Sequence, residues 1–146
     1  EPSERPTRTA VVVGDLFPLG LAMAANGFAS PIRVLTPSEA GAALAALREY
    51  QETQPGGLLR GDARFKLHLL LPAFCRLVLH PVLVRAVCEA LGTPDVLCWS
   101  SDLNVKEARS PTYASAHQDS TYANLLPTDA ALTAWLALSD APLEAG

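Results

Sequence analysis

The sequence predicts an α+β domain in which helices come first and strands follow. Between residues 37 and 91 apolar side chains recur at helical spacing, whereas along residues 96–106 apolar and polar side chains alternate. Gly92 stands between the two patterns, and glycine readily ends a helix. We therefore expect helices that support one side of an antiparallel sheet or barrel.

The composition is that of one ordinary domain. Its 146 residues suffice for a buried core, and a net charge of −4 without a basic block argues against a nucleic-acid partner. Pro72 and the polar side chains of His68, Arg76 and His80 interrupt the longest apolar run, so we expect no membrane span. The cysteines, Cys75, Cys88 and Cys98, lie in apolar segments without CxxC spacing. They indicate reduced thiols in an intracellular protein, located in the cytoplasm.

The chain is expected to start with an arm and a short extended segment. Residues 1–9 are polar and proline-rich and predict a flexible arm, and the domain proper, residues 10–146, opens with a β-prone run at residues 10–13. No GxGxxG loop follows this run, so a dinucleotide-binding unit is not expected. Residues 26–34 predict a turn and a second short extended segment.

Three helices follow, each with a recognisable start. A capping box at residues 36–39 begins a helix that reaches about residue 52. The second helix covers about residues 72–79. The third covers residues 81–91, begins with a proline and stops at Gly92.

Strands are predicted in the second half of the chain. The first covers residues 96–106, the second residues 114–120 and the third residues 131–138. The apolar face of the first strand comprises Leu97, Trp99, Leu103 and Val105. Its polar face, which includes Asp102 and Asn104, is either ordinary solvated surface or the lining of a cavity.

His117 and Asp119 form the most informative motif. Residues two apart share one face of a strand, so the imidazole and the carboxylate would stand side by side. Together they supply two ligands of the 2-His-1-carboxylate triad, which holds non-haem Fe(II) and leaves positions open for a co-substrate and O2. This spacing also arises by chance. The short connection from residues 96–106 favours a cavity shared by the pair and the polar face of that strand.

Several segments resemble the phytanoyl-CoA dioxygenase-like family in order and spacing. The strongest is the run His-Gln-Asp-Ser-Thr-Tyr at residues 117–122, continued by Ala-Trp-Leu-Ala-Leu-Ser-Asp at residues 134–140. Earlier segments lie at residues 26–36, at His80-Pro81, at Leu91-Gly92 and at residues 96–107. The resemblance extends from residue 26 to the end of the sequence and is more specific than His-x-Asp alone.

The resemblance implies an Fe(II)- and 2-oxoglutarate-dependent oxygenase on a double-stranded β-helix, a jelly-roll or cupin-like core, with N-terminal supporting helices. It makes His117 and Asp119 the first two iron ligands and the catalytic residues. The residues expected to bind the 2-oxoglutarate co-substrate are Trp135, Asn104 and Lys66, with Arg64 competing for the role of Lys66. O2 is the other co-substrate. An aspartate at the carboxylate position favours hydroxylation, because halogenases of similar fold carry a small residue there.

The substrate contacts are less well defined. Tyr122 is expected either to contact the substrate or to pack as an ordinary aromatic residue, and Asp102 either faces the pocket mouth or is a surface carboxylate. The resemblance implies a small organic substrate. The identity of that substrate and the oligomeric state stay open.

One part of the family pattern has no counterpart in the sequence. The family continues with a distal histidine and a basic residue that grips 2-oxoglutarate, whereas His68 and His80 both precede the pair. We therefore expect the N-terminal part of a single oxygenase domain, with the first barrel strands at about residues 95–140. The alternatives are a catalytically silent jelly-roll module that binds a partner or small ligand, and a cupin-like enzyme that uses another divalent metal without 2-oxoglutarate.

Overall fold

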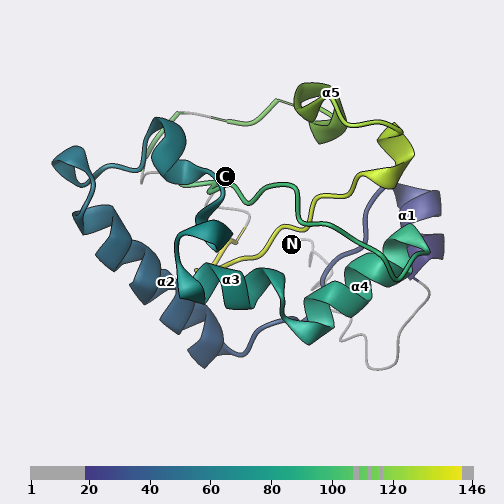
Figure 1. Ribbon diagram of the computed structural model, residues 1–146, viewed down its shortest axis with the longest axis horizontal. Coiled ribbons are helices and arrows are strands. Elements are labelled where there is room, and N and C mark those ends of the chain that lie inside the picture. The colour runs from purple at the N-terminus through teal and green to yellow at the C-terminus, as the bar shows by residue number, and fades with distance from the viewer. Residues whose placement is uncertain (1–18, 107–108, 112, 116, 143–146) are drawn as a thin grey trace, which may run out of the picture.

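The computed structural model describes residues 19–106, 109–111, 113–115 and 117–142 (Figure 1). The arm expected at residues 1–9 and the run at residues 10–13 lie outside these residues. The α-helices are α1 (Leu19–Asn26), α2 (Pro37–Glu52), α3 (Pro72–Val78), α4 (Pro81–Leu91) and α5 (Asp119–Ala123). Over the described residues, no helix has both the length and the apolar character that crossing a membrane requires.

Helix α2 begins at the predicted capping box. The hydroxyl oxygen of Thr36 accepts a hydrogen bond from the amide of Glu39 (3.2 Å), and the Glu39 carboxylate accepts one from the amide of Thr36 (2.8 Å). Pro37 occupies the first turn, where an N–H would have no partner within the helix. The helix ends at Glu52, so the predicted start and end are both confirmed.

Helices α3 and α4 also confirm the predicted positions. Each begins with a proline, and His80 immediately precedes α4. Gly92 ends α4 with a φ of 67°, a left-handed conformation that glycine adopts without strain. Helix α1, by contrast, was not predicted, because its residues are apolar all round and form no periodic stripe. It packs on α4, where the amide of Leu19 donates to the carboxylate of Glu89 (2.9 Å).

The main core lies where α2 and α3 meet the extended chain. Its buried members are Leu47, Leu67, Phe74 and Leu103, and Leu67 is almost completely enclosed. Burying one such side chain contributes about 1.5–3 kcal/mol relative to leaving it exposed. Because Leu103 belongs to this cluster, the middle of segment 96–106 is anchored to the helices.

Hydrogen bonds from the loop before α3 hold the same segment. The amide of Lys66 donates to the carbonyl of Ser101 (2.7 Å). The guanidinium of Arg64 donates to the carbonyl of Leu103 through Nε (3.2 Å) and Nη2 (2.7 Å). Backbone groups that would otherwise need a partner strand are thus satisfied by this loop.

Four apolar residues along residues 96–106 were expected to be buried, and the structure buries one of them. Leu103 is 8% exposed, whereas Leu97 is 88% and Trp99 52% exposed. The prediction of a continuous buried face is therefore wrong. The helices lie beneath the middle of the segment, and an apolar side chain is buried only where another element covers it.

The described residues form no β-strand, and the three predicted strand segments carry no regular secondary structure there apart from the bridge at Asp102 and the start of α5. In this part of the chain, Phe65 and Asp102 form an isolated antiparallel bridge, and no longer ladder is present. A strand needs a partner for its amide and carbonyl groups, and the bridge supplies one at a single point. The jelly-roll core stays a prediction.

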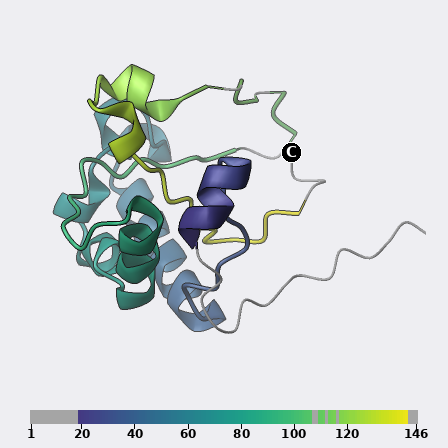
Figure 2. The ribbon, with the colours of Figure 1, turned by 90° about the vertical axis from the view of Figure 1, so that its right-hand side faces the viewer.

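The strand predicted at residues 114–120 is wrong for its last two residues, where α5 begins. The amide of Thr121 donates to the carbonyl of Gln118 (3.1 Å), and Asn124 ends the helix with a φ of 53°. The helix is only five residues long and has no side-chain cap at its start, and the Asp119 carboxylate contacts His117 and Thr133 instead. Figure 2 places α5 at the edge of the molecule, away from α3 and α4.

Candidate metal centre

His117 and Asp119 lie in contact at the start of α5. Gln118, between them, has an extended backbone (φ −115°, ψ 122°), and Asp119 is the first helical residue. Nε2 of His117 is 3.0 Å from Oδ1 of Asp119. The structure therefore brings the predicted pair together, through a turn into a helix and not through a shared strand face.

Two neighbours orient the imidazole of His117. Its Nδ1 is 2.6 Å from the carbonyl oxygen of Ser115. A carbonyl only accepts, so Nδ1 carries the hydrogen and donates it, which leaves Nε2 directed at Asp119. The ring of Tyr122 meets the imidazole edge-on, with centroids 5.7 Å apart and planes at 76°. Tyr122 thus lies beside the pair, and its role as a substrate contact stays a prediction.

These contacts raise the pKa of His117 above its ordinary value. The largest cause is the carbonyl of Ser115, which accepts a hydrogen bond from the ring and favours its protonated form. The carboxylate of Asp119 acts in the same direction, and desolvation opposes both. Without a metal the pair holds a proton more firmly than a free imidazole does, and a metal ion must displace that proton.

The carboxylate of Asp119 is also oriented by a neighbour. The hydroxyl of Thr133 donates a hydrogen bond to Oδ2, the oxygen that is not in contact with His117. Thr133 belongs to the extended segment after η4 (Thr128–Ala130), a 3-10 turn that follows α5. Sequence reasoning did not assign Thr133 to the site. The available signal was its place two residues before Trp135, on the same face of the predicted strand.

The two donor atoms fit a shared metal ion. Ligands about 2.1 Å from a metal on adjacent corners of an octahedron lie about 3.0 Å apart. The separation of Nε2 of His117 and Oδ1 of Asp119 is 3.0 Å. Metal-binding histidines commonly donate their other ring N–H to a carbonyl, as His117 does to Ser115. The side chains are 40% and 55% exposed, so further ligands can reach the pair.

A third protein ligand is not found within the described residues, where no group of three metal-binding side chains gathers. The described contacts of the other histidines are with residues outside the pair. Nδ1 of His68 is 2.8 Å from the hydroxyl of Ser101, and Nε2 of His80 is 4.0 Å from a carboxylate oxygen of Glu39. The expectation that His68 and His80 have other roles agrees with these contacts.

The residues predicted to bind 2-oxoglutarate make no described polar contact with the pair. Over the described chain, no hydrogen bond or ion pair joins Trp135, Asn104 or Lys66 to it, and all three side chains are exposed. Asp102, the other proposed substrate contact, lies 3.7 Å from Nη2 of Arg64, and its carboxylate accepts a hydrogen bond from the next amide (2.7 Å). These contacts hold the Asp102 carboxylate beside Arg64.

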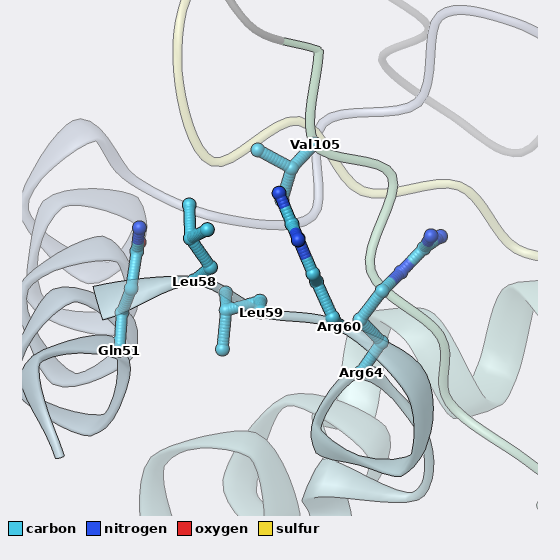
Figure 3. A pocket seen from close by; sticks show the side chains of 6 residues that line it. All are labelled: Gln51, Leu58, Leu59, Arg60, Arg64 and Val105. Atoms are coloured by element: carbon cyan, nitrogen blue, oxygen red, sulfur yellow. The ribbon is translucent and has the colours of Figure 1, made fainter. Parts of the chain in front are cut away.

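Arg64 lines a separate pocket of about 210 Å³ (Figure 3). Its lining residues are Gln51, Leu58, Leu59, Arg60, Arg64 and Val105. Arg60 extends toward Val105, and the leucines lie between Arg60 and Gln51 (Figure 3). The guanidinium of Arg64 is already engaged by the carbonyl of Leu103 and lies 3.7 Å from Asp102, so Arg60 is the lining residue whose charge could attract an anionic ligand. Lys66 is not part of the lining, so of the two residues that compete for the co-substrate, Arg64 is the one placed in a pocket.

A family model matches most of the chain. It is described as phytanoyl-CoA dioxygenase (PhyH) and matches residues 23–146. No curated protein and no solved structure matches the chain significantly. The matched range includes His117, Asp119 and the three residues that contact them, Ser115, Tyr122 and Thr133.

Proposed function

Because the chain belongs to the phytanoyl-CoA dioxygenase family, we propose that it is an Fe(II)- and 2-oxoglutarate-dependent dioxygenase with a jelly-roll core. The proposed reaction is hydroxylation of a small organic substrate. One atom of O2 enters the substrate and the other enters succinate, as 2-oxoglutarate loses CO2. Asp119 favours hydroxylation over halogenation, because a carboxylate occupies the position that a halide would need.

One observation carries this proposal beyond the family match. Nε2 of His117 and Oδ1 of Asp119 lie 3.0 Å apart, and the remaining polar atom of each side chain is engaged by another residue. Orientation by outer hydrogen bonds is typical of metal ligands. A surface ion pair of His and Asp needs no such support, since it gains little from fixed geometry.

Each residue of the pair has a proposed role. His117 ligates Fe(II) through Nε2 as the neutral imidazole, its tautomer fixed by the carbonyl of Ser115. Asp119 ligates through Oδ1 and offsets part of the positive charge. When bound, the metal would supply open positions for 2-oxoglutarate and O2 and would activate O2, the oxidant of the reaction. Tyr122, which packs against the imidazole, is proposed to border the substrate.

The remaining roles rest on the family resemblance. Trp135, Asn104 and Lys66 are proposed to contact 2-oxoglutarate, and Arg64 is the alternative to Lys66. Asp102 is proposed to face the substrate at the pocket mouth. Neither His68 nor His80 is proposed as the third iron ligand, because the described contact of His68 is with Ser101 and that of His80 is with Glu39.

A second candidate function is a silent module that binds a ligand without catalysis. It is favoured by the absence of a third ligand within the described residues and by the exposure of the pair. A cupin-like enzyme that uses another divalent metal is the third candidate. Both differ from the dioxygenase in one respect that can be measured: neither consumes 2-oxoglutarate.

The test is succinate release by the full-length protein with Fe(II), 2-oxoglutarate, O2 and a panel of small organic substrates. The dioxygenase is expected to need both Fe(II) and 2-oxoglutarate. Asp119→Ala should abolish turnover while the circular dichroism spectrum is retained, because the side chain is exposed and belongs to no core cluster. Asp129→Ala, an exposed aspartate in η4, is the matched control and should retain turnover.

The outcomes separate the three candidates. Undiminished turnover in Asp119→Ala would refute the ligand assignment. Failure of the wild-type protein to bind Fe(II) or to release succinate would favour the silent module. Metal-dependent turnover that does not need 2-oxoglutarate would favour the cupin-like enzyme.

A further inference from the structure

We propose that Thr133 is a positioning residue that fixes how Asp119 presents its carboxylate to a metal ion. The hydroxyl of Thr133 donates a hydrogen bond to Oδ2 of Asp119. The two residues lie 14 positions apart and belong to different segments, so the contact is tertiary and not a product of local sequence. This inference rests on the proposed function, because it needs Asp119 to be a ligand.

The two oxygens of Asp119 have different partners. Oδ1 is 3.0 Å from Nε2 of His117, and Oδ2 accepts the hydrogen bond from Thr133. A carboxylate can give a metal one oxygen or both. Because Oδ1 faces His117 while Oδ2 is turned toward the Thr133 hydroxyl, Oδ1 is the oxygen placed to ligate beside His117. A single-oxygen contact leaves one more metal position open than a chelating contact would. Thr133 thereby preserves a position for co-substrate or O2.

The carboxylate of Asp119 does not stabilise the free amides at the start of α5. An acidic residue in the first turn of a helix often stabilises free amides there. The described contacts of the Asp119 carboxylate are instead with His117 and Thr133, both side chains, and α5 is only five residues long. Thr133 is exposed and is not part of the core, so its hydroxyl is not required for packing.

The experiment is a titration of the full-length protein with Co(II), which replaces Fe(II) and reports its ligands by visible absorption. Four variants are compared with the wild type: Thr133→Val, Thr133→Ser, Thr121→Val and Asp119→Ala. Valine keeps the shape of threonine and removes the hydroxyl, whereas serine keeps the hydroxyl. Thr121 is the matched control, an exposed threonine of α5 whose hydroxyl has no hydrogen bond in the described structure.

Thr133→Val is expected to weaken Co(II) binding by about 10- to 100-fold, the usual effect of losing a residue that orients a metal ligand. Its Co(II) absorption should also change shape, because the freed carboxylate can rotate. Thr133→Ser should restore both properties, and Thr121→Val should match the wild type. Circular dichroism should be the same for all variants.

Two other results would overturn the inference in distinguishable ways. If Asp119→Ala loses Co(II) but Thr133→Val binds it with wild-type affinity and absorption, Thr133 does not position the ligand and the proposed function is unaffected. If Asp119→Ala binds Co(II) as the wild type does, or the wild type does not bind it, both the ligand assignment and this inference are wrong.

Discussion

His117 and Asp119 are joined by a turn into a helix, with Nε2 of the histidine 3.0 Å from Oδ1 of the aspartate. The sequence pattern predicted the same contact from a shared strand face. A spacing of two residues brings side chains together on a strand, and here an extended residue followed by the first residue of α5 has the same result. The contact therefore does not depend on the secondary structure that was used to predict it.

The His117–Asp119 pair should make the stability of the metal-free protein depend on pH. The pKa of His117 is raised, so the folded state binds a proton more tightly than the unfolded state. The resulting stabilisation is complete below the ordinary histidine pKa. It is lost as the pH rises through the higher pKa that His117 has in the folded state. Asp119→Asn removes part of this effect. Urea unfolding should find the variant less stable than wild type at about pH 5 and equal to it at about pH 9.

An NMR titration checks the same prediction at the residue itself. The pKa of His117 should fall in Asp119→Asn but stay above its ordinary value, since the carbonyl of Ser115 is the larger cause of the shift. His68, which contacts Ser101 and not the pair, serves as the internal control. A pKa of His117 that does not change in the variant would contradict the contact.

The capping box of α2 should produce the opposite dependence on pH. Hydrogen bonds from the amide and then the hydroxyl of Thr36 lower the pKa of Glu39, so this carboxylate stabilises the fold above its ordinary pKa. That stabilisation is lost as the pH falls through the lowered pKa of Glu39. Glu39→Gln should therefore be less stable than wild type at about pH 7 and similar to it at about pH 2. Equal stability at both values would show that the charge of Glu39 contributes nothing to the capping box.

Removing the hydroxyl of Ser101 should loosen the loop before α3. This hydroxyl contacts Nδ1 of His68 (2.8 Å) and accepts from the His68 amide (3.3 Å), and both residues are partly buried. Ser101→Ala is expected to cost about 1–2 kcal/mol in urea unfolding, because it leaves polar groups unpaired. Ser100→Ala, one residue away and without a described hydroxyl contact, should change stability by less than about 0.5 kcal/mol.

Two glycine substitutions should have opposite signs. Gly92 has a φ of 67° at the end of α4, so Gly92→Ala is expected to destabilise the fold by about 1 kcal/mol. Gly41 lies inside α2, and a Cβ built there meets nothing within 4 Å. Gly41→Ala should stabilise by about 0.5–1 kcal/mol, because glycine disfavours a helix interior. Thermal unfolding of the two variants measures both effects. Effects of the same sign would contradict the left-handed conformation of Gly92 or the helical position of Gly41.

The sequence alone determined the helices that carry their own boundary signals and the identity of the candidate ligands. Helices α2, α3 and α4 begin at prolines, and α4 ends at Gly92, so local chemistry sufficed to place them. His117 and Asp119 were chosen for the same reason: imidazole and carboxylate are the donor types that Fe(II) takes, and their spacing is visible in the chain. Family membership confirms the resemblance.

Only the tertiary structure decided which residues surround the pair and which apolar residues are buried. Thr133 reaches Asp119 from 14 residues away, and Leu103 is buried while Leu97 on the same predicted face is exposed. The physical reason is the same in both cases. A helix satisfies its backbone from its own neighbours, but a contact between segments and the burial of an extended face depend on what the fold places opposite them.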